Sequence, residues 1–282
     1  MFTTLISTAD LAAHLADPAF VLVDVRHDLT QPDAWGEAAY GLGHLPGARF
    51  VHLDRDLSAP KTGRNGRHPL PNAQTCAELF GRLGIDATKQ VVAYDQGSGM
   101  YAARLWWMLR ALGHDAAAVL DGGYAAWTNE GRPVTTALPA HARATFAARA
   151  VTANVDASAV AASLGAGSLL LIDARGRERF RGDAEPLDPV AGHIPGALNR
   201  PYLENLDAEG RFKPAATLAA EFGALLGGRA PAGVVHYCGS GVSACHNLLA
   251  MAHAGLDGAR LFPGSWSEWC ADPARPAARG DA

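Results

Sequence analysis

The sequence contains the same four motifs twice, in the same order. In the first half they are FVLVDVR (20–26), GHLPGA (43–48), VVAYD (91–95) and LDGGYAAW (120–127). In the second half they are LLLIDAR (169–175), GHIPGA (192–197), VVHYC (234–238) and FPGSWSEW (262–269). Asp173 follows Asp24 by 149 residues, and Cys238 follows Asp95 by 143. Four motifs at nearly constant spacing predict a tandem duplication, so the chain must build one fold twice.

Each copy alternates short apolar runs with helical patterns. The runs VLVDV, QVVAY and AAAVL are typical of strands buried on both faces, and helices are expected over 77–84 and 101–112. This alternation predicts an α/β fold in each half, with a mainly parallel sheet flanked by helices. We place the domains at 1–140 and 141–282, with an exposed linker rich in Ala, Thr and Pro over 133–151.

The composition excludes several classes of protein. The 282 residues are 49% hydrophobic and 18% charged, with a net charge of −4, so a nucleic-acid or anionic-membrane surface is not indicated. No run reaches the ~18 apolar residues of a membrane span, and Asp10 and Asp17 interrupt the N-terminal stretch where a signal peptide would be apolar. Four dispersed cysteines indicate free thiols, and we expect a cytoplasmic monomer.

Cys238 stands at the end of a predicted strand over 234–237, directly before a glycine-rich loop. Because a helix is expected to begin near Val242 or Ser243, the loop lies at the carboxyl end of a parallel strand, where ligands gather. Gly239 and Gly241 allow the backbone N–H groups to turn inward and form an anion cradle. A thiol in such a cradle is expected to be a thiolate nucleophile.

The first half offers an internal control. At the position that matches Cys238 it has Asp95, in a loop that is one residue longer (YDQGSGMYAAR). A carboxylate cannot carry a sulfur atom. We therefore expect a catalytic second domain and a catalytically inactive first domain.

These motifs together resemble those of the tandem-domain rhodanese-type sulfurtransferases, and most closely the 3-mercaptopyruvate sulfurtransferase branch. The resemblance rests on both GH[LI]PGA turns, RHPLP, the DAR…RFRG stretch, CGSGV and GSWSEW. It implies that Cys238 takes a sulfane sulfur from a small-molecule donor as a persulfide and passes it to cyanide or a thiol acceptor. A thioredoxin-like protein is one candidate acceptor, and no cofactor is implied.

The resemblance also implies roles for other residues. Ser240, His68 and Asp54 would form a proton relay, in which Asp54 orients His68 and His68 takes a proton through Ser240. Arg179 would bind the donor carboxylate, and the backbone of Gly239, Gly241, Val242 and Ser243 would line the donor site. The family usually has a second arginine at the place where this chain has Leu187 and Asp188. Arg181 is the candidate replacement.

Several alternatives remain open from the sequence. A thiosulfate sulfurtransferase would carry two cations in the loop, where this chain has neutral Gly239 and Ser240. A non-catalytic rhodanese-like binding module would have no need of a thiolate in an anion cradle. A phosphatase of the Cys-x₅-Arg type would need an arginine where this chain has Ala244. The cluster His236, Cys238, Cys245 and His246 suggests a metal site, but strand and helix periodicity divides it, and no metal is predicted.

Overall fold

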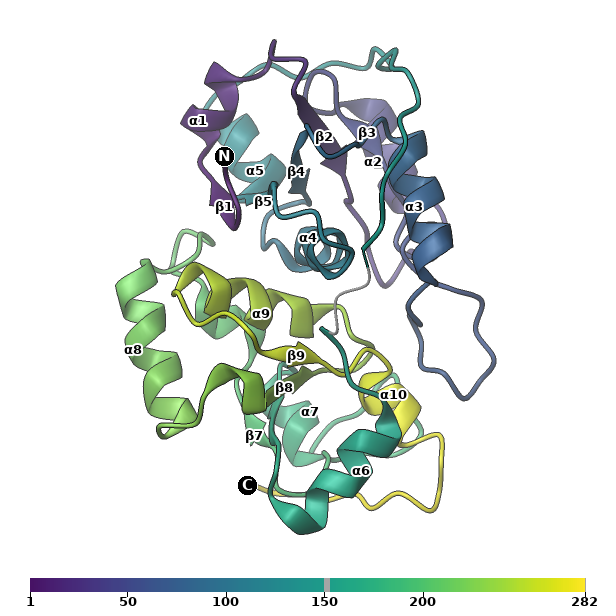
Figure 1. Ribbon diagram of the computed structural model, residues 1–282, viewed down its shortest axis with the longest axis vertical. Coiled ribbons are helices and arrows are strands. Elements are labelled where there is room, and N and C mark those ends of the chain that lie inside the picture. The colour runs from purple at the N-terminus through teal and green to yellow at the C-terminus, as the bar shows by residue number, and fades with distance from the viewer. Residues whose placement is uncertain (150–152, 282) are drawn as a thin grey trace. The chain divides into compact units, whose positions relative to one another are not determined.

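The computed structural model describes residues 1–149 and 153–281, which form two compact units (Figure 1). Unit 1 consists of the described residues of Met1–Ala59, Pro71–Thr152 and Ala208–Phe212. Unit 2 consists of those of Pro60–Leu70, Ala153–Asp207 and Lys213–Ala282. Each unit thus includes a short segment, 60–70 or 208–212, from the half of the sequence that builds mainly the other unit.

Unit 1 contains one five-stranded parallel sheet. Its strand order is β1 (Leu5–Ile6), β5 (Ala117–Leu120), β4 (Gln90–Tyr94), β2 (Phe20–Asp24) and β3 (Arg49–Phe50). Its helices are α1 (Thr8–Ala13), α2 (Trp35–Leu42), α3 (Ala73–Arg82), α4 (Met100–Ala111) and α5 (Gly123–Asn129).

Both faces of this sheet are covered by helices. Successive strand residues point to opposite faces. On one face Leu22 and Val92 pack in a core with Leu11 of α1 and Trp127 of α5. On the other face α4 packs against β4 and β5. Burial on both sides explains why these strands read as continuous apolar runs in the sequence.

Unit 2 repeats this plan with a four-stranded parallel sheet. Its strand order is β7 (Leu198–Asn199), β6 (Leu170–Asp173), β8 (Val234–Tyr237) and β9 (Arg260–Leu261). The helices are α6 (Ala157–Ala166), α7 (Arg177–Arg181), α8 (Ala215–Leu226), α9 (Ser243–His253) and α10 (Ser265–Trp269), with 3₁₀ turns at η1 (Tyr202–Asn205) and η2 (Pro231–Gly233). The predicted α/β class, with two parallel sheets flanked by helices, is confirmed.

The repeated motifs make the same contacts in both units. His44 stacks on Tyr40 and His193 stacks on Phe180, each with 3.8 Å between the ring centroids. In each case the histidine Nδ1 lies within hydrogen-bond distance of the partner's backbone carbonyl, at 2.9 Å and 2.8 Å respectively. Because unit 1, which has Asp95 in place of Cys238, keeps this arrangement, the two histidines have a structural role.

Two predicted elements differ from the structure. The helix expected over 77–84 begins at Ala73, because the Asn72 side chain accepts the Thr75 N–H at 2.9 Å and caps it. The described part of the expected linker 133–151 is not exposed chain throughout. Phe146 packs edge-on against Phe80 at 5.0 Å in unit 1, so its ring anchors the segment. Residues 150 and 151 of that linker lie outside the described residues, and the domain boundary at 140/141 stays a prediction.

No helix in the described ranges is long and apolar enough to span a membrane.

Candidate functional site

Cys238 directly follows β8, one of the two inner strands of the unit 2 sheet, and precedes the loop that leads into α9. β8 pairs with β6 on one side and with β9 on the other, and α9 begins five residues after the cysteine. The residue is 2% exposed. Gly241 adopts φ +77°, and the Pro263 carbonyl occupies the space that a side chain would need there. Only glycine fits this turn of the loop.

Backbone and hydroxyl groups hold the cysteine in place. The Gly241 N–H points to the Cys238 Sγ, with 3.1 Å between nitrogen and sulfur. The Cys238 N–H donates to Ser265 Oγ at 3.1 Å, and Ser265 Oγ donates onward to the Phe262 carbonyl at 2.9 Å. Ser265 is buried at φ +55°, a strained value for a residue with a side chain. Sequence reasoning missed Ser265. The available signal was its counterpart in the first half, Gly123, because a glycine at this position indicates a positive φ.

The matching loop of unit 1 shows what such a loop binds. Asp95 Oδ1 accepts the N–H groups of Gly97 and Gly99, both at 2.9 Å, and Oδ2 accepts the Tyr101 N–H at 2.9 Å. Burial raises the pKa of Asp95, and these hydrogen bonds act in the opposite direction. The loop of unit 1 therefore surrounds the Asp95 side chain with backbone N–H groups. The matching loop of unit 2 directs the Gly241 N–H at the sulfur of Cys238 in the corresponding position.

His68 and Ser240 lie together in unit 2. His68 belongs to the segment Pro60–Leu70, whose backbone is tied to this unit by the Arg67 N–H donating to Ser267 Oγ at 3.0 Å. The His68 Nδ1 lies 2.8 Å from Ser240 Oγ, and both side chains are buried. The geometry allows a proton to pass between the imidazole and the hydroxyl, two residues beyond Cys238.

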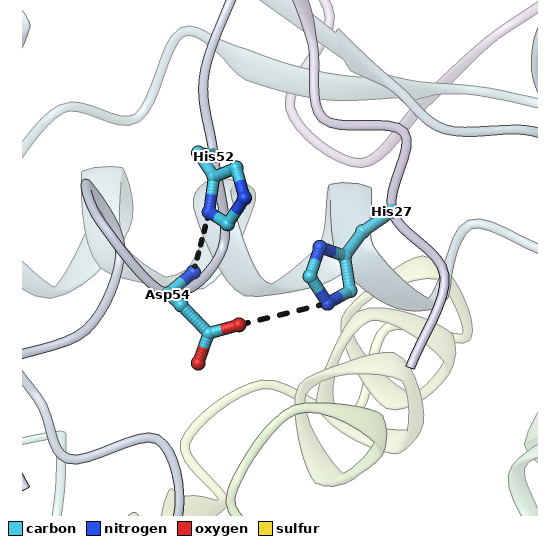
Figure 2. A group of neighbouring side chains, drawn as sticks. All are labelled: His27, His52 and Asp54. Atoms are coloured by element: carbon cyan, nitrogen blue, oxygen red, sulfur yellow. Dashed lines mark hydrogen bonds and ion pairs between the residues drawn. The ribbon is translucent and has the colours of Figure 1, made fainter. Parts of the chain in front are cut away.

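Asp54 belongs to unit 1, where it lies close to two histidines (Figure 2). Its N–H donates to His52 Nδ1 at 3.1 Å, and His52 Nε2 lies 2.9 Å from the Pro32 carbonyl. Both ring nitrogens of His52 are therefore engaged with backbone groups. The Asp54 carboxylate lies 3.8 Å from His27 Nε2. Burial lowers the pKa of His27, against the raising effect of Asp54. The role of Asp54 in the relay stays a prediction.

The guanidinium of Arg179 lies at the cysteine loop, and its binding of the donor stays a prediction. Its Nη1 and Nη2 atoms are each 3.4 Å from the place where a Gly239 side chain would begin. Its Nε donates to Glu185 Oε2 at 3.2 Å and its Nη2 to Glu185 Oε1 at 2.7 Å. Burial acts to raise the pKa of Glu185, but the hydrogen bonds from Arg179 and Leu187 outweigh it and lower the value. The carboxylate is therefore charged and fixes the guanidinium edge that it binds.

A second guanidinium at the loop belongs to Arg67, which sequence reasoning missed. Its Nη2 lies 2.6 Å from the Gly239 side-chain position, and its Nη1 pairs with Asp188 Oδ1. The loop itself is neutral, as the sequence shows, but its surroundings are not. The sequence did offer one signal for Arg67. It directly precedes the candidate site residue His68 in GRHPLP, so it must lie near the same site.

The remaining predicted residues have clear positions. Val242 is the residue before the first turn of α9, and Ser243 is the first residue of that helix. Arg175 is a structural partner of Asp173, with Nη2 2.6 Å from Oδ2, as Arg26 is of Asp24 in unit 1. The guanidinium of Arg181, the candidate replacement for the second family arginine, pairs with Asp183 and Asp281 at the surface, and its role at the donor site stays a prediction.

The other cysteines and histidines near the loop have partners of their own. Cys245 Sγ donates to the Gly241 carbonyl at 3.3 Å, and His236 Nε2 lies 3.0 Å from Met251 Sδ. Burial lowers the pKa of His236 to about 3. His246 Nδ1 lies 3.2 Å from Asn205 Nδ2. These side chains serve the packing of β8 and α9 against their neighbours.

The chain is similar to proteins of one family over most of its length. The family model described as rhodanese-like domain matches residues 7–130 and 156–272. A probable 3-mercaptopyruvate sulfurtransferase of Pseudomonas aeruginosa is 46% identical over 98% of both chains. A putative thiosulfate sulfurtransferase of Mycobacterium tuberculosis is 45% identical over 99% of this chain and 98% of its own. A solved 3-mercaptopyruvate sulfotransferase of Escherichia coli matches 94% of this chain and 99% of its own, with a TM-score of 0.80 and 32% identity.

Proposed function

The chain belongs to the rhodanese-like domain family, and on that premise we propose that it transfers sulfur from 3-mercaptopyruvate through a persulfide on Cys238. The observation that carries the proposal is the sulfur of Cys238 held by the Gly241 N–H, with the His68–Ser240 pair beside it. Relatives named for this donor, in Pseudomonas aeruginosa and in mouse, support the same choice.

In the first half-reaction the Cys238 thiolate attacks the sulfur of the donor. A sulfur–sulfur bond forms, the carbon–sulfur bond breaks, and its electron pair leaves on carbon as the enolate of pyruvate. The proton of the donor thiol passes through Ser240 and His68 to the enolate carbon, which gives pyruvate and an anionic persulfide. The N–H groups of the loop stabilise that anion as an oxyanion hole does.

In the second half-reaction the acceptor attacks the outer sulfur. Cyanide forms a carbon–sulfur bond, the sulfur–sulfur bond breaks, and the electron pair returns to Cys238 as the thiolate. Thiocyanate leaves, and no oxidant or reductant is consumed. A thiol acceptor instead leaves as a persulfide of its own, and we propose a small thiol or a thioredoxin-like protein as the physiological acceptor.

Thiosulfate is the second candidate donor. The relative in Mycobacterium tuberculosis carries that name, and the two guanidinium groups beside Gly239 suit a dianion as well as a carboxylate. The histidine–hydroxyl pair favours mercaptopyruvate, because that donor has a thiol proton to move and thiosulfate has none.

The test is a comparison of the two donors with cyanide as the acceptor. We expect kcat/KM to be higher for mercaptopyruvate by at least about tenfold, which is ~1.4 kcal/mol of transition-state discrimination. Equal or reversed values would assign the enzyme to thiosulfate. A protein inactive on both donors, with Cys238 unmodified, would be a binding module instead.

We also propose a cytoplasmic monomer. All four cysteines lie in the described residues and are free thiols, which suits a reducing compartment. Sedimentation at micromolar concentration and cell fractionation test the two statements separately.

A further inference from the structure

Two guanidinium groups approach the residue next to the nucleophile from different segments. Arg179 extends from α7 and Arg67 from the segment Pro60–Leu70, and both belong to unit 2. Arg67 Nη2 is 2.6 Å and Arg179 Nη1 is 3.4 Å from the side-chain position of Gly239. A side chain at position 239 would have to displace the guanidinium group of Arg67. The glycine therefore leaves room for a cation supplied by another part of the chain.

One carboxylate holds both cations in place. Asp188 Oδ1 pairs with Arg67 Nη1, and Asp188 Oδ2 lies 3.3 Å from Arg179 Nη2. The Asp188 side chain is only 3% exposed, and its N–H donates to Glu185 Oε1 at 3.2 Å, which fixes the turn. Asp188 therefore sets the spacing between the two guanidinium groups.

The guanidinium edges that face the cysteine loop take no part in the ion pairs with Asp188 and Glu185. Within the described part of the chain, Arg67 Nη2 and Arg179 Nη1 donate to no protein acceptor, while the opposite edges are held by Asp188 and Glu185. The two side chains are 27% and 23% exposed, so a solute can reach them. A purely structural ion pair would not need a second guanidinium edge directed at the cysteine loop.

We propose that Arg67, positioned by Asp188, binds the anionic group of the sulfur donor together with Arg179. The inference rests on the proposed function for the identity of the donor, but it requires only that the donor is an anion. A guanidinium presents its N–H groups in a plane that matches a carboxylate, and two of them clamp it from two sides. This fixes the donor sulfur against Cys238 and sets which anions the site accepts.

The first experiment measures alkylation of Cys238 in the full chain, with peptide mapping to separate it from the other cysteines. Iodoacetate is an anion and iodoacetamide is its neutral analogue, so their rate ratio reports the cations at the thiol. In Arg67→Met we expect the ratio to fall by about tenfold, the value of one lost charge-assisted hydrogen bond. Arg64→Met removes an exposed arginine of the same segment and is the matched control.

The second experiment measures KM and kcat with mercaptopyruvate and cyanide. Arg67→Met should raise KM by about tenfold or more, and Arg67→Lys, which keeps the charge and loses the fork, should fall between it and wild type. If Asp188 positions Arg67, Asp188→Asn should raise KM by a smaller factor in the Arg67→Met background than in the wild type, and the factor that remains comes from its contact with Arg179.

The outcomes separate this inference from the proposed function. An alkylation ratio and a KM equal to those of Arg64→Met would overturn the role of Arg67, even with mercaptopyruvate as the preferred donor. A fall in the ratio in an enzyme that uses thiosulfate would uphold Arg67 as an anion-binding residue and overturn the proposed donor.

Discussion

The Nδ1 atom of His68 lies 2.8 Å from the Oγ atom of Ser240, although the two residues are 172 positions apart in the sequence. The segment Pro60–Leu70 carries the histidine into unit 2, and both side chains are buried there. Because burial keeps this contact largely out of solvent, the pair is organised before a donor arrives.

Replacing His68 should therefore remove proton transfer and leave the reactivity of the Cys238 thiol unchanged. We expect His68→Ala to lower turnover of mercaptopyruvate by roughly 10²- to 10⁴-fold, the usual contribution of a positioned acid–base group. Transfer from thiosulfate should fall much less, because that donor has no thiol proton. His141→Ala, at an exposed histidine of unit 1, serves as the control. An unchanged rate on mercaptopyruvate in His68→Ala would exclude the relay.

At Ser265 a glycine variant should be more stable than an alanine variant, the reverse of the usual order. Ser265→Ala keeps the strained φ and leaves the Cys238 N–H without its acceptor, whereas Ser265→Gly loses the same hydrogen bond but relieves the strain. We expect the glycine variant to be more stable than the alanine variant by about 1 kcal/mol in urea unfolding of the full chain. The opposite order would show that φ +55° is not strained in this protein.

Gly241 should be essential for a steric reason beyond its backbone angle. Gly241→Ala must fit a side chain where the Pro263 carbonyl lies, which moves the N–H away from the cysteine sulfur. We expect sulfur transfer to fall by about 10²-fold or more, as when one oxyanion donor is lost.

Gly196 is the matched control for that variant. It has φ +76° in the same unit, and no atom lies within 4 Å of its side-chain position. Gly196→Ala should lose roughly 1–2 kcal/mol of stability and keep its activity per folded molecule. If both variants kept full activity, the Gly241 N–H would have no part in sulfur transfer.

Labelling by iodoacetamide should separate Cys238 from Cys76. Burial raises the pKa of Cys76 to about 11, above its ordinary value of 9.0, so its thiolate fraction stays small until the pH approaches the higher value. At pH 8 the folded chain should be labelled at Cys238 and not at Cys76, and Cys76 should react once urea unfolds the chain. Fast labelling of Cys76 in the folded chain would contradict this assignment.

Local patterns predicted the strand and the helix on either side of the Cys238 loop. The strand over Val234–Tyr237 and the helix from Ser243 follow directly from an apolar run, a glycine pair and a helical stripe. The duplication pointed to Asp95 as the counterpart of Cys238, and the structure shows its carboxylate among backbone N–H groups. The first inference depends only on residues close together in the sequence, and the second on the repetition of the same short motifs in both halves.

Long-range contacts were harder to predict. Arg67 and Asp188 are 121 residues apart, and no periodicity or motif relates them. The loop at Gly239 reads as neutral because its own side chains are uncharged, while its positive charge comes from Arg67 and Arg179. Residue spacing within one helix, strand or loop shows which side chains that element has. It does not show which side chains from distant parts of the sequence lie next to it in the fold.

Sulfur transfer through Cys238 is tested most directly by the intact mass of the protein after exposure to mercaptopyruvate without an acceptor. We expect a gain equal to one sulfur atom, located on Cys238 by peptide mapping and lost again when cyanide is added. Cys76→Ser, Cys245→Ser and Cys270→Ser should retain this gain, and Cys238→Ser should not. Sulfur found on another cysteine, or a Cys238→Ser variant that still transfers sulfur, would contradict the central claim.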